Sequence, residues 1–496
     1  MTIEIFHGRE LIWIGAILEG KAPSHQRFFE SMPMIEAELG YVPKKYFLYQ
    51  IPLGRVERGP DKSLHSRQEN QKSSGEKRKK QVVPLKGERR SAEKLSYLAK
   101  RSPLTKKLAQ WQIKGERRKD MDPRRMKDKH LMLGIIGIVM ILALFGLIGI
   151  SQASPILSRL NTITTIASTV PANGDLNPYG VAKVEQPVGD LKEGHILVSN
   201  FNNSANLQGT GSTIVDVSPD GTASLFAQIN ANDLPGACPG GVGLTTALVV
   251  LRSGWVIVGS LPTTDGTAAT AQAGCLIVLD SKGNPVETIS GTLINGPWDM
   301  GAFEDGNQAF LFVTNVLNDT VAGGGNVVNE GTVVRINLDV SKKKMPEVLS
   351  ITVIGSGFPE RTDPAALVIG PTGVGISPEH KVLYVADSLN NRIAVIEDAI
   401  DRTTSAGIGT TLSEDGSLND PLGLVVTANG HILTVNGNDG FITEISPGGD
   451  QVAKKQLDNT GNPPGAGTLF GLTYDPRFGV YFVDNGTNTL NLLRKR

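Results

Sequence analysis

This sequence of 496 residues has few of the residue types on which most recognisable active sites depend. It contains two cysteines and seven histidines, and aromatic residues make up 5% of the chain. No cysteine pair has the spacing of a zinc site, and no His-Glu-x-x-His, Gly-x-Ser-x-Gly, Walker or EF-hand motif occurs. Its glycine clusters do not follow a strand and open a helix, so dinucleotide binding is not expected. No set of catalytic residues is therefore predicted.

The chain also lacks net charge, but residues 1–130 are basic and residues 131–496 are acidic. Residues 1–130 hold 30 Lys and Arg against 16 Asp and Glu, which leaves 19 against 33 for the remainder. From residue 56 the first part is mostly Lys, Arg, Glu, Gln and Ser, too polar to offset the entropy of folding. We expect 1–130 to be a largely disordered cytoplasmic region whose charge fixes membrane topology. Binding of anionic lipid or nucleic acid is the alternative, and translation starting at Met121 or Met126 would omit most of it.

One long run without charge separates the two parts. Residues 131–150, LMLGIIGIVMILALFGLIGI, can cross a hydrocarbon core of ~30 Å as a helix. Basic residues cluster just before it, and the next one after it is Arg159, so the positive-inside rule exports the C-terminal part. Segment 131–151 is either an uncleaved transmembrane helix or a signal segment cleaved near Ala153. Both place the larger part of the chain in the periplasm, at the cell surface or outside the cell.

Both cysteines, Cys238 and Cys275, lie in the exported part. A disulfide is permitted there, and closing this loop is worth roughly 3–4 kcal/mol by the loop-entropy model. Two buried free thiols are the alternative.

A unit recurs six times in the exported part. It has a short strand near Pro-x-Gly, a tight turn, and a second strand that ends in Asn, Asp or Ser. These second strands are 195–200, 255–260, 310–315, 382–387, 431–436 and 479–484. Six units of about four strands predict an all-β fold, a six-bladed β-propeller over residues 160–496. The last unit offers only three strands, so we expect strand 162–170 to complete it and close the ring.

Residues 371–396, PTGVGISPEHKVLYVADSLNNRIAVI, resemble an NHL repeat in their Pro-x-Gly-Val start, Leu-Tyr-Val-Ala-Asp strand and Asn-x-Arg. Weaker copies begin at Pro421, Phe470, Pro178, Thr246 and Pro297. The resemblance extends over about 160–496 and implies an NHL-type propeller, commonly with an interaction surface. Relatives by fold include gluconolactonase-like and strictosidine-synthase-like enzymes and a calcium-dependent lyase. The fold alone does not transfer those activities.

The long loops all fall on one face of the expected propeller. On the other face the strands are joined mostly by tight Gly, Asn and Asp turns. The long loops are 201–211, 229–243, 261–274, 316–331 and 355–370. Long loops on a rigid scaffold usually hold the binding residues, so we expect binding at this long-loop face.

Two sets of side chains are expected at the mouth of the central channel on this face. The aromatic candidates, which open innermost strands, are Tyr179, Trp298 and Phe470. The amide candidates, which end second strands, are Asn200, Asn315 and Asn436. Together they suit a small polar ligand such as a sugar or lactone. The alternative is structural: the rings pack between blades, and the polar residues bond their own loops, as expected for Asp387 with Asn391 and Arg392.

Asp299, Asp387 and Asp484 are candidate calcium ligands, because calcium takes six to eight oxygen ligands that a propeller can supply around its channel. Hydrolases that this fold resembles use such an ion to polarise an ester carbonyl. This chain departs from them, because Tyr179 stands where their first inner strand opens with an acidic residue.

The leading expectation is a binding or scaffold module for a protein, small polar ligand or glycan at the long-loop face. A calcium-dependent hydrolase or lyase acting on a lactone or ester is the second, and a purely structural envelope protein the third. The acidic balance of the exported part argues against nucleic acid as its partner.

Overall fold

The computed structural model describes residues 2–8, 11–17, 154–341, 345–364 and 366–496. The chain divides into two units, residues 1–129 and 130–496. In the first unit, strands β1 (Thr2–Gly8) and β2 (Leu11–Ile17) form an antiparallel hairpin. The rest of the expected disordered region and the hydrophobic segment 131–150 lie outside the described residues. Within the described residues, no helix has the length and apolar character to span a bilayer.

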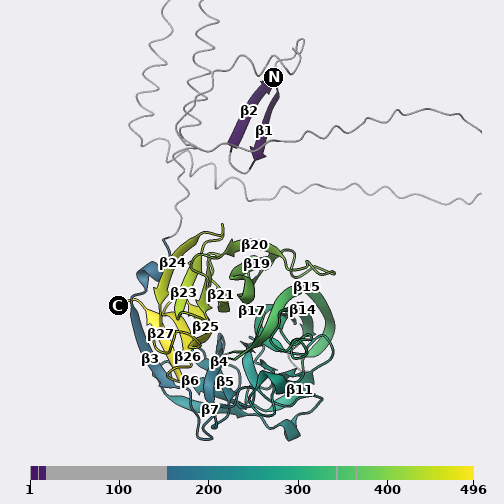
Figure 1. Cartoon of the computed structure of the whole chain (residues 1–496), viewed down its shortest axis with the longest axis vertical. Coiled ribbons are helices and arrows are strands. Elements are labelled where there is room, and N and C mark those ends of the chain that lie inside the picture. The colour runs from purple at the N-terminus through teal and green to yellow at the C-terminus, as the bar shows by residue number, and fades with distance from the viewer. Residues whose placement is uncertain (1, 9–10, 18–153, 342–344, 365) are drawn as a thin grey trace, which may run out of the picture. The chain divides into compact units, whose positions relative to one another are not determined.

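The second unit is a six-bladed β-propeller, which confirms the predicted fold (Figure 1). In each blade an antiparallel sheet starts with its innermost strand at the channel. Blade 1 consists of β4 (Leu176–Lys183), β5 (Ile196–Asn202), β6 (Thr213–Val217) and β7 (Ala223–Gln228). Blade 2 consists of β8 (Leu244–Val250), β9 (Val256–Ser260), β10 (Cys275–Leu279) and β11 (Pro285–Ile289). Blade 3 consists of β12 (Pro297–Asp305), β13 (Gln308–Asn315), β14 (Val328–Asp339), β15 (Glu347–Asp363) and β16 (Leu367–Ile369).

The remaining three blades follow the same order. Blade 4 consists of β17 (Pro371–Ile376), β18 (Leu383–Asp387), β19 (Arg392–Ile396) and β20 (Thr410–Glu414). Blade 5 consists of β21 (Pro421–Val426), β22 (Ile432–Asn436), β23 (Phe441–Ile445) and β24 (Gln451–Gln456). Blade 6 consists of β25 (Leu469–Asp475), β26 (Gly479–Asp484), β27 (Thr489–Arg494) and β3 (Thr162–Ser168). Short 3-10 helices are η1 (Leu157–Arg159), η2 (Ala231–Asp233), η3 (Ala268–Thr270) and η4 (Ser388–Asn390).

The two ends of the propeller meet in blade 6. Strand β3 pairs antiparallel with β27, with Thr162 opposite Arg494 and Ser168 opposite Thr489, and Figure 1 shows the two side by side near the C-terminus. This confirms the predicted closure, although the strand is two residues shorter than 162–170. Pairing with β3 removes the free edge that β27 would otherwise expose.

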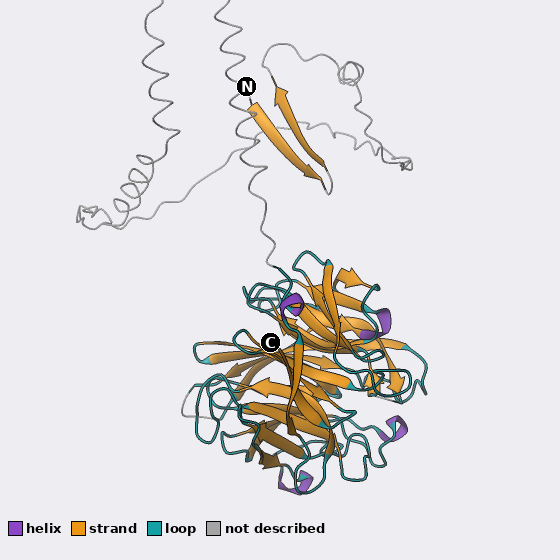
Figure 2. Ribbon diagram, turned by 90° about the vertical axis from the view of Figure 1, so that its left-hand side faces the viewer, coloured by secondary structure: helices purple, strands orange, loops and turns teal. Residues whose placement is uncertain are grey.

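The residues before β3 fix where the chain enters the propeller. Leu157 and Leu160 are buried in the core that blades 5 and 6 share. The carboxylate of Glu444 accepts hydrogen bonds from the backbone N–H groups of Ile156 and Leu157, both at 2.8 Å. His431 Nδ1 lies 2.6 Å from the same carboxylate. Residues 154–160, here called the entry strap, therefore lie at the face opposite the long loops, the short-turn face. Figure 2 shows the strands of the blades with short helices in the connections between them.

The second strands form the most buried layer, because blades pack on both sides of them. Strands β9, β18 and β22 are buried along their whole length, and Val, Ile and Leu dominate them. The innermost strands approach one another more closely than a side chain allows. A Cβ atom at Gly423 would lie 2.1 Å from the carbonyl oxygen of Phe470, and one at Gly471 would lie 2.0 Å from that of Tyr179. This contact explains the glycine of the Pro-x-Gly repeat.

Blade 2 contains the predicted disulfide. Cys238 bonds Cys275 with a Cα–Cα distance of 5.2 Å, which ties the long loop 229–243 to strand β10.

One predicted loop is instead a hairpin. The Gly and Pro residues of 355–370 indicated a loop, but β15 runs through to Asp363 and β16 folds back against its end. Register shifts between β14 and β15 take up these residues, so the ladder continues past local turn signals. The β15–β16 hairpin lies at the long-loop face and changes the mouth of the channel.

Candidate functional site: the channel and the long-loop face

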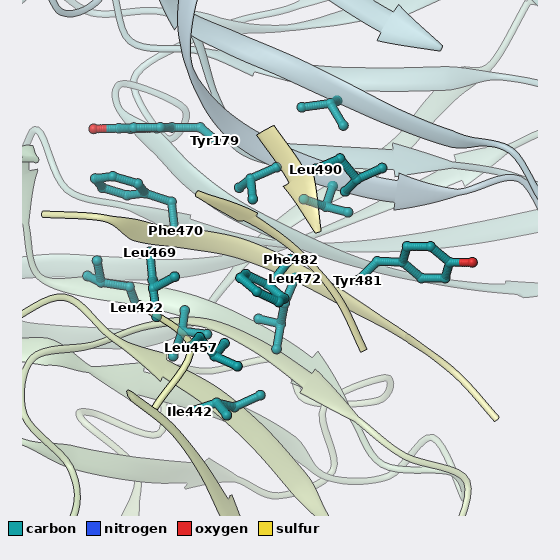
Figure 3. Close-up of a cluster of buried hydrophobic side chains, with 14 of the residues drawn as sticks. Tyr179, Leu422, Ile442, Leu457, Leu469, Phe470, Leu472, Tyr481, Phe482 and Leu490 are labelled. Carbon is teal, nitrogen blue, oxygen red and sulfur yellow. The ribbon is translucent and has the colours of Figure 1, made fainter. Parts of the chain in front are cut away.

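The long-loop end of the channel is filled by side chains. The ring of Tyr179 stacks on those of Phe201 and Phe470, with centroids 4.4 Å and 4.0 Å apart. Tyr179 and Phe470 lie together beside Leu422 in Figure 3. Tyr179, Trp298, Leu422 and Phe470, here called the aromatic plug, are each at most 2% exposed. Burial raises the pKa of the Tyr179 hydroxyl above its ordinary value.

The β15–β16 hairpin completes this closure. Leu367, Val368 and Ile369 are buried in the same cluster as the plug. The indole Nε1 of Trp298 donates a hydrogen bond to the carbonyl oxygen of Val368 at 3.1 Å. The predicted aromatic residues thus pack between blades, as the structural alternative required, and a ligand role for them stays a prediction.

The predicted amide residues are completely buried at the ends of the second strands. Asn200 Nδ2 donates to the carbonyl oxygen of Thr169 at 2.9 Å, and Asn436 Nδ2 donates to that of Ser417 at 2.8 Å. Each hydrogen bond holds the connecting segment, or crossover, that runs from the preceding blade into the blade of the asparagine. Asn315 lies at the equivalent position, and its side chain has no hydrogen-bond partner among the described residues. The structure therefore supports a structural role for Asn200 and Asn436.

The three predicted calcium ligands lie on three different blades. Asp387 Oδ2 accepts hydrogen bonds from Arg392 and from Asn390 Nδ2. The expected partner Asn391 instead accepts one from the backbone N–H of Asp420, because its left-handed backbone turns it toward the crossover. Asp484 accepts from the backbone N–H of Thr487, and burial raises its pKa. In the described part of the chain, no three His, Cys, Asp or Glu side chains gather as a possible metal site.

A calcium ion of the kind implied by the resemblance does not fit the long-loop mouth. The side chains that open innermost strands here belong to Tyr179, Trp298, Thr372, Leu422 and Phe470. None is a carboxylate, and the rings are buried against one another, whereas calcium needs six to eight oxygen ligands.

Beyond the plug, the channel contains a cavity of about 290 Å³ toward the short-turn face. The innermost strands of all six blades line it, and their inner edges have no neighbouring strand. Its polar side chains are Lys183, Thr246, Asp299 and Thr473. The hydroxyl of Thr246 is buried, and no residue in the described part of the chain forms a hydrogen bond with it.

Asp299 occupies the position that is glycine in four other blades. In the sheet register, Pro297-Trp-Asp299 matches the Pro-x-Gly units that end at Gly180, Gly373 and Gly423. The carboxylate accepts hydrogen bonds from the backbone N–H groups of Met300 at 2.8 Å and Val374 at 3.2 Å. Burial nevertheless raises the pKa of Asp299 to about 8, so near neutral pH it can both donate and accept a proton.

An ion pair lies at the short-turn end of the cavity. Lys183 Nζ is 2.7 Å from Asp475 Oδ2 and 2.9 Å from Glu185 Oε1. Burial alone would raise the pKa of Asp475, but hydrogen bonds from Lys183 and Arg477 lower it to about 2. Sequence reasoning named Thr246 only as the start of a repeat unit, and it missed Lys183, which no motif marks. The unusual position of Asp299 was readable, as an Asp where four other units have glycine.

The connecting loops of the long-loop face have charge of one sign, and Arg361 of the β15–β16 hairpin is a basic residue beside them. These loops contain eight Asp and no Lys, Arg, His or Glu. The loops are 169–175, 203–212, 229–243, 261–274, 290–296, 316–327, 364–366, 388–391, 415–420, 437–440, 457–468 and 485–488. Asp233, Asp265, Asp319 and Asp415 are exposed. The short-turn face mixes both signs, with Arg252, Lys282 and Lys381 in its turns.

A further carboxyl, which sequence reasoning missed, lies where this face meets the channel. Asp420 immediately precedes β21, and one of its carboxyl oxygens is buried with no hydrogen-bond partner in the described ranges. Burial and the nearby Asp363 raise its pKa to about 7, while Arg361 opposes the shift. Arg361 itself pairs with Asp363 at 3.1 Å.

Comparison with known proteins places this fold. Residues 258–463 match the family described as SMP-30/Gluconolactonase/LRE-like region, which confirms the resemblance of the propeller to gluconolactonase-like proteins. No curated protein matches the chain. Among solved structures, a gluconolactonase from Xanthomonas campestris is 13% identical, with a TM-score of 0.42 over 68% of this chain and 94% of that one. A streptogramin B lyase is 14% identical, with a TM-score of 0.40 over 68% and 98%. The calcium-binding protein regucalcin from Agrobacterium tumefaciens is 12% identical, with a TM-score of 0.40 over 67% and 94%.

Proposed function

We propose, from the premise that this chain carries a gluconolactonase-like propeller, that it is an exported, membrane-anchored binding module. Its partner is a cationic protein segment that docks on the long-loop face. The observation that supports this most is the charge of that face, where eight Asp stand in loops without a single basic residue. Such a field attracts a positively charged partner and repels nucleic acid.

The rigidity of the scaffold adds to this support. The loops of the face are fastened by the Cys238–Cys275 disulfide and by side-chain bonds such as that of Asn436. The aromatic plug and the β15–β16 hairpin close the channel beneath them. A partner therefore meets a preformed acidic surface, so little ordering entropy is lost on binding.

Binding of a short oligolysine peptide tests this proposal. The full-length protein is placed in phosphatidylcholine nanodiscs, and peptide affinity is measured by fluorescence anisotropy at low salt. We expect Asp→Asn replacement at 233, 265, 319 and 415 to weaken binding about tenfold, because four exposed charges that attract the peptide are removed together.

Four exposed Asp of the short-turn face provide the matched control. Asp190, Asp220, Asp398 and Asp450 are replaced by Asn in a second variant, which changes the net charge equally. It should bind the peptide like the unmodified chain. An equal loss in both variants would mean that total charge attracts the peptide and would overturn the proposed face.

A second candidate function is hydrolysis in the channel. It is favoured by Asp299, which lies within the matched segment 258–463, lines the cavity and has a pKa near neutrality. A carboxyl with that pKa is suited to general acid–base catalysis. The family description names gluconolactonase, so a sugar lactone is the substrate class to examine first.

Lactone hydrolysis by the full-length protein, followed by acid release, tests this second candidate. Asp299→Asn should abolish turnover while the fold remains intact by circular dichroism. Glu360→Gln is the control, because Glu360 is also a buried carboxyl whose pKa burial raises to about 8, but it lies outside the channel. Absence of turnover in the unmodified chain would eliminate this candidate and leave the binding module.

A further inference from the structure

A second pocket lies beside the entry strap on the short-turn face of blade 6. Its volume is about 270 Å³. Four cationic side chains line it together with two aromatic ones: Arg159, Arg477, Arg494, Lys495, Tyr474 and Phe478. Among the described residues, no carboxylate lines it. Three different segments supply these cations, so the fold and not a run of sequence collects the charge.

Two of the guanidinium groups have no acidic partner in the described part of the chain. Arg159 Nη2 donates to the carbonyl and hydroxyl oxygens of Ser154, both at 2.7 Å. Arg494 Nε donates to the hydroxyl of Thr164 at 3.2 Å. These neutral acceptors orient the guanidinium groups and leave their positive charge uncompensated. The remaining donors suit a phosphate, which accepts several hydrogen bonds at once.

The third guanidinium is only partly neutralised. Arg477 lies 3.3 Å from Asp475, but that carboxylate is also bonded to Lys183 at 2.7 Å. Lys183 also pairs with Glu185 at 2.9 Å, so two carboxylates face two cations here, and the excess positive charge of the pocket comes from Arg159, Arg494 and Lys495. The side chain of Arg477 is 59% exposed, which leaves its guanidinium accessible from the pocket. The pocket keeps a net positive charge.

An exposed aromatic ring lies at the rim. Phe478 is 48% exposed at the tip of the β25–β26 turn, and the guanidinium of Arg477 lies 5.3 Å from its ring centroid. An aromatic ring beside basic residues is the combination found where proteins enter the interfacial region of a bilayer.

The position of the pocket in the chain points to the same surroundings. Ile156, Arg159 and Leu160 of the entry strap form part of its wall. Only residues 151–153 separate the strap from the hydrophobic segment 131–150. Three residues span ~10 Å at most, about one Debye length, so an anchored chain holds the start of the strap, and with it this side of blade 6, near the membrane surface.

We propose that this pocket binds the phosphate of an anionic phospholipid and seats the short-turn face on the bilayer. This rests on the proposed anchoring, and it deepens the proposed function by turning the acidic long-loop face away from the membrane. Phe478 enters the interfacial region while the arginines contact the headgroups. Residues 131–150 hold the chain at the membrane, and the pocket sets the orientation of the propeller.

A single fluorescent label at residue 478 tests the orientation. Both native cysteines are joined in the disulfide, so Phe478→Cys introduces one reactive thiol for an environment-sensitive dye. The full-length chain is placed in discs of phosphatidylcholine alone or with phosphatidylglycerol. We expect a blue shift, and quenching by brominated lipid, only in the discs that contain phosphatidylglycerol.

Two charge variants of the labelled chain complete the test. Arg159→Gln, Arg477→Gln and Arg494→Gln together should abolish the shift. Arg252→Gln, Lys282→Gln and Lys381→Gln together remove the same charge from exposed turns of the same face and should retain it. A shift in neutral discs, no shift in either disc, or an equal loss in both variants would overturn the pocket.

The lipid site and the acidic long-loop face can be tested separately. A chain that does not enter discs would overturn the anchoring on which both depend. Oligolysine binding in neutral discs reports the long-loop face alone, because neither charge variant changes that face. Retained peptide binding without the label shift would therefore overturn only the lipid site.

Discussion

The carboxyl of Asp299 is held in the channel wall by two backbone N–H groups, from Met300 in its own strand and from Val374 in the next blade. Four of the other blades place glycine there because neighbouring atoms, in most of them the next innermost strand, leave no room for a Cβ atom. Blade 3 therefore departs from the repeat at one position, and that position faces the cavity. A departure that costs burial of a carboxyl indicates a role beyond packing.

Asp299 should make the stability of the propeller depend on pH. Burial raises its folded pKa from 3.8 to about 8, so between these values the folded state keeps a proton that the unfolded state has lost. The free energy of unfolding then falls as pH rises through this window, by at most about 1.4 kcal/mol per unit. Asp299→Asn should remove this pH-dependent contribution to the free energy of unfolding. The difference in free energy of unfolding, variant minus unmodified chain, should therefore increase by about 2 kcal/mol from pH 5 to pH 7.

Urea unfolding at both pH values measures this difference. Asn cannot accept a hydrogen bond through its amide nitrogen, so the variant should be less stable at pH 5, by about 1 kcal/mol. Glu360→Gln should show the same sign, because burial also raises the pKa of Glu360 to about 8. A difference between Asp299→Asn and the unmodified chain that does not change with pH would show that Asp299 is ionised in the folded protein throughout.

At the scale of the elements, the entry strap is expected to stabilise the ring through Leu157. This side chain is 1% exposed in the core shared by blades 5 and 6. Leu157→Ala should lower the free energy of unfolding by about 2–4 kcal/mol, because it leaves a cavity. Leu225→Ala, at a leucine that is 51% exposed on β7, should change it by less than about 0.5 kcal/mol. Urea unfolding of the two variants compares them, and equal effects would mean that the strap is dispensable.

The strands could be predicted wherever the recurring sequence unit of the blades was present. The six second strands and the closing strand β3 followed from one unit and the deficit in its last copy. The β15–β16 hairpin could not, because Gly355, Gly357 and Pro359 are local turn signals that only pairing with the long strand β14 overrides.

The candidate site was less predictable than the fold because its contacts join distant residues. Trp298 meets Val368, and Asp299 meets Val374, about 70 positions along the chain. Composition identified the aromatic rings as special, but it could not tell an open mouth from a packed plug. Only the pairing of Asp387 with Arg392, five positions apart, was readable from local sequence.

At the scale of the whole molecule, the propeller has two faces of different character. The long-loop face is acidic and preformed, and the short-turn face contains the chain entry, the basic pocket and the open end of the cavity. Both depend on a ring that is closed by joining residues 162–168 to 489–494. A propeller without that closure would expose the edge of β27 along its length.

Two truncated chains test how far the ring depends on its closing strand. Residues 154–496 contain the strap and β3, whereas residues 171–496 lack both, and neither contains the hydrophobic segment. The longer chain should be monomeric in sedimentation velocity and should unfold in one transition. The shorter one should lose at least about 3 kcal/mol through the burial of Leu157 and Leu160 alone, and should associate through the free edge of β27. A synthetic peptide of residues 154–170 should restore the monomer, because it supplies the missing strand. If the shorter chain is monomeric and melts like the longer one, β3 only covers a ring that the other contacts already hold closed.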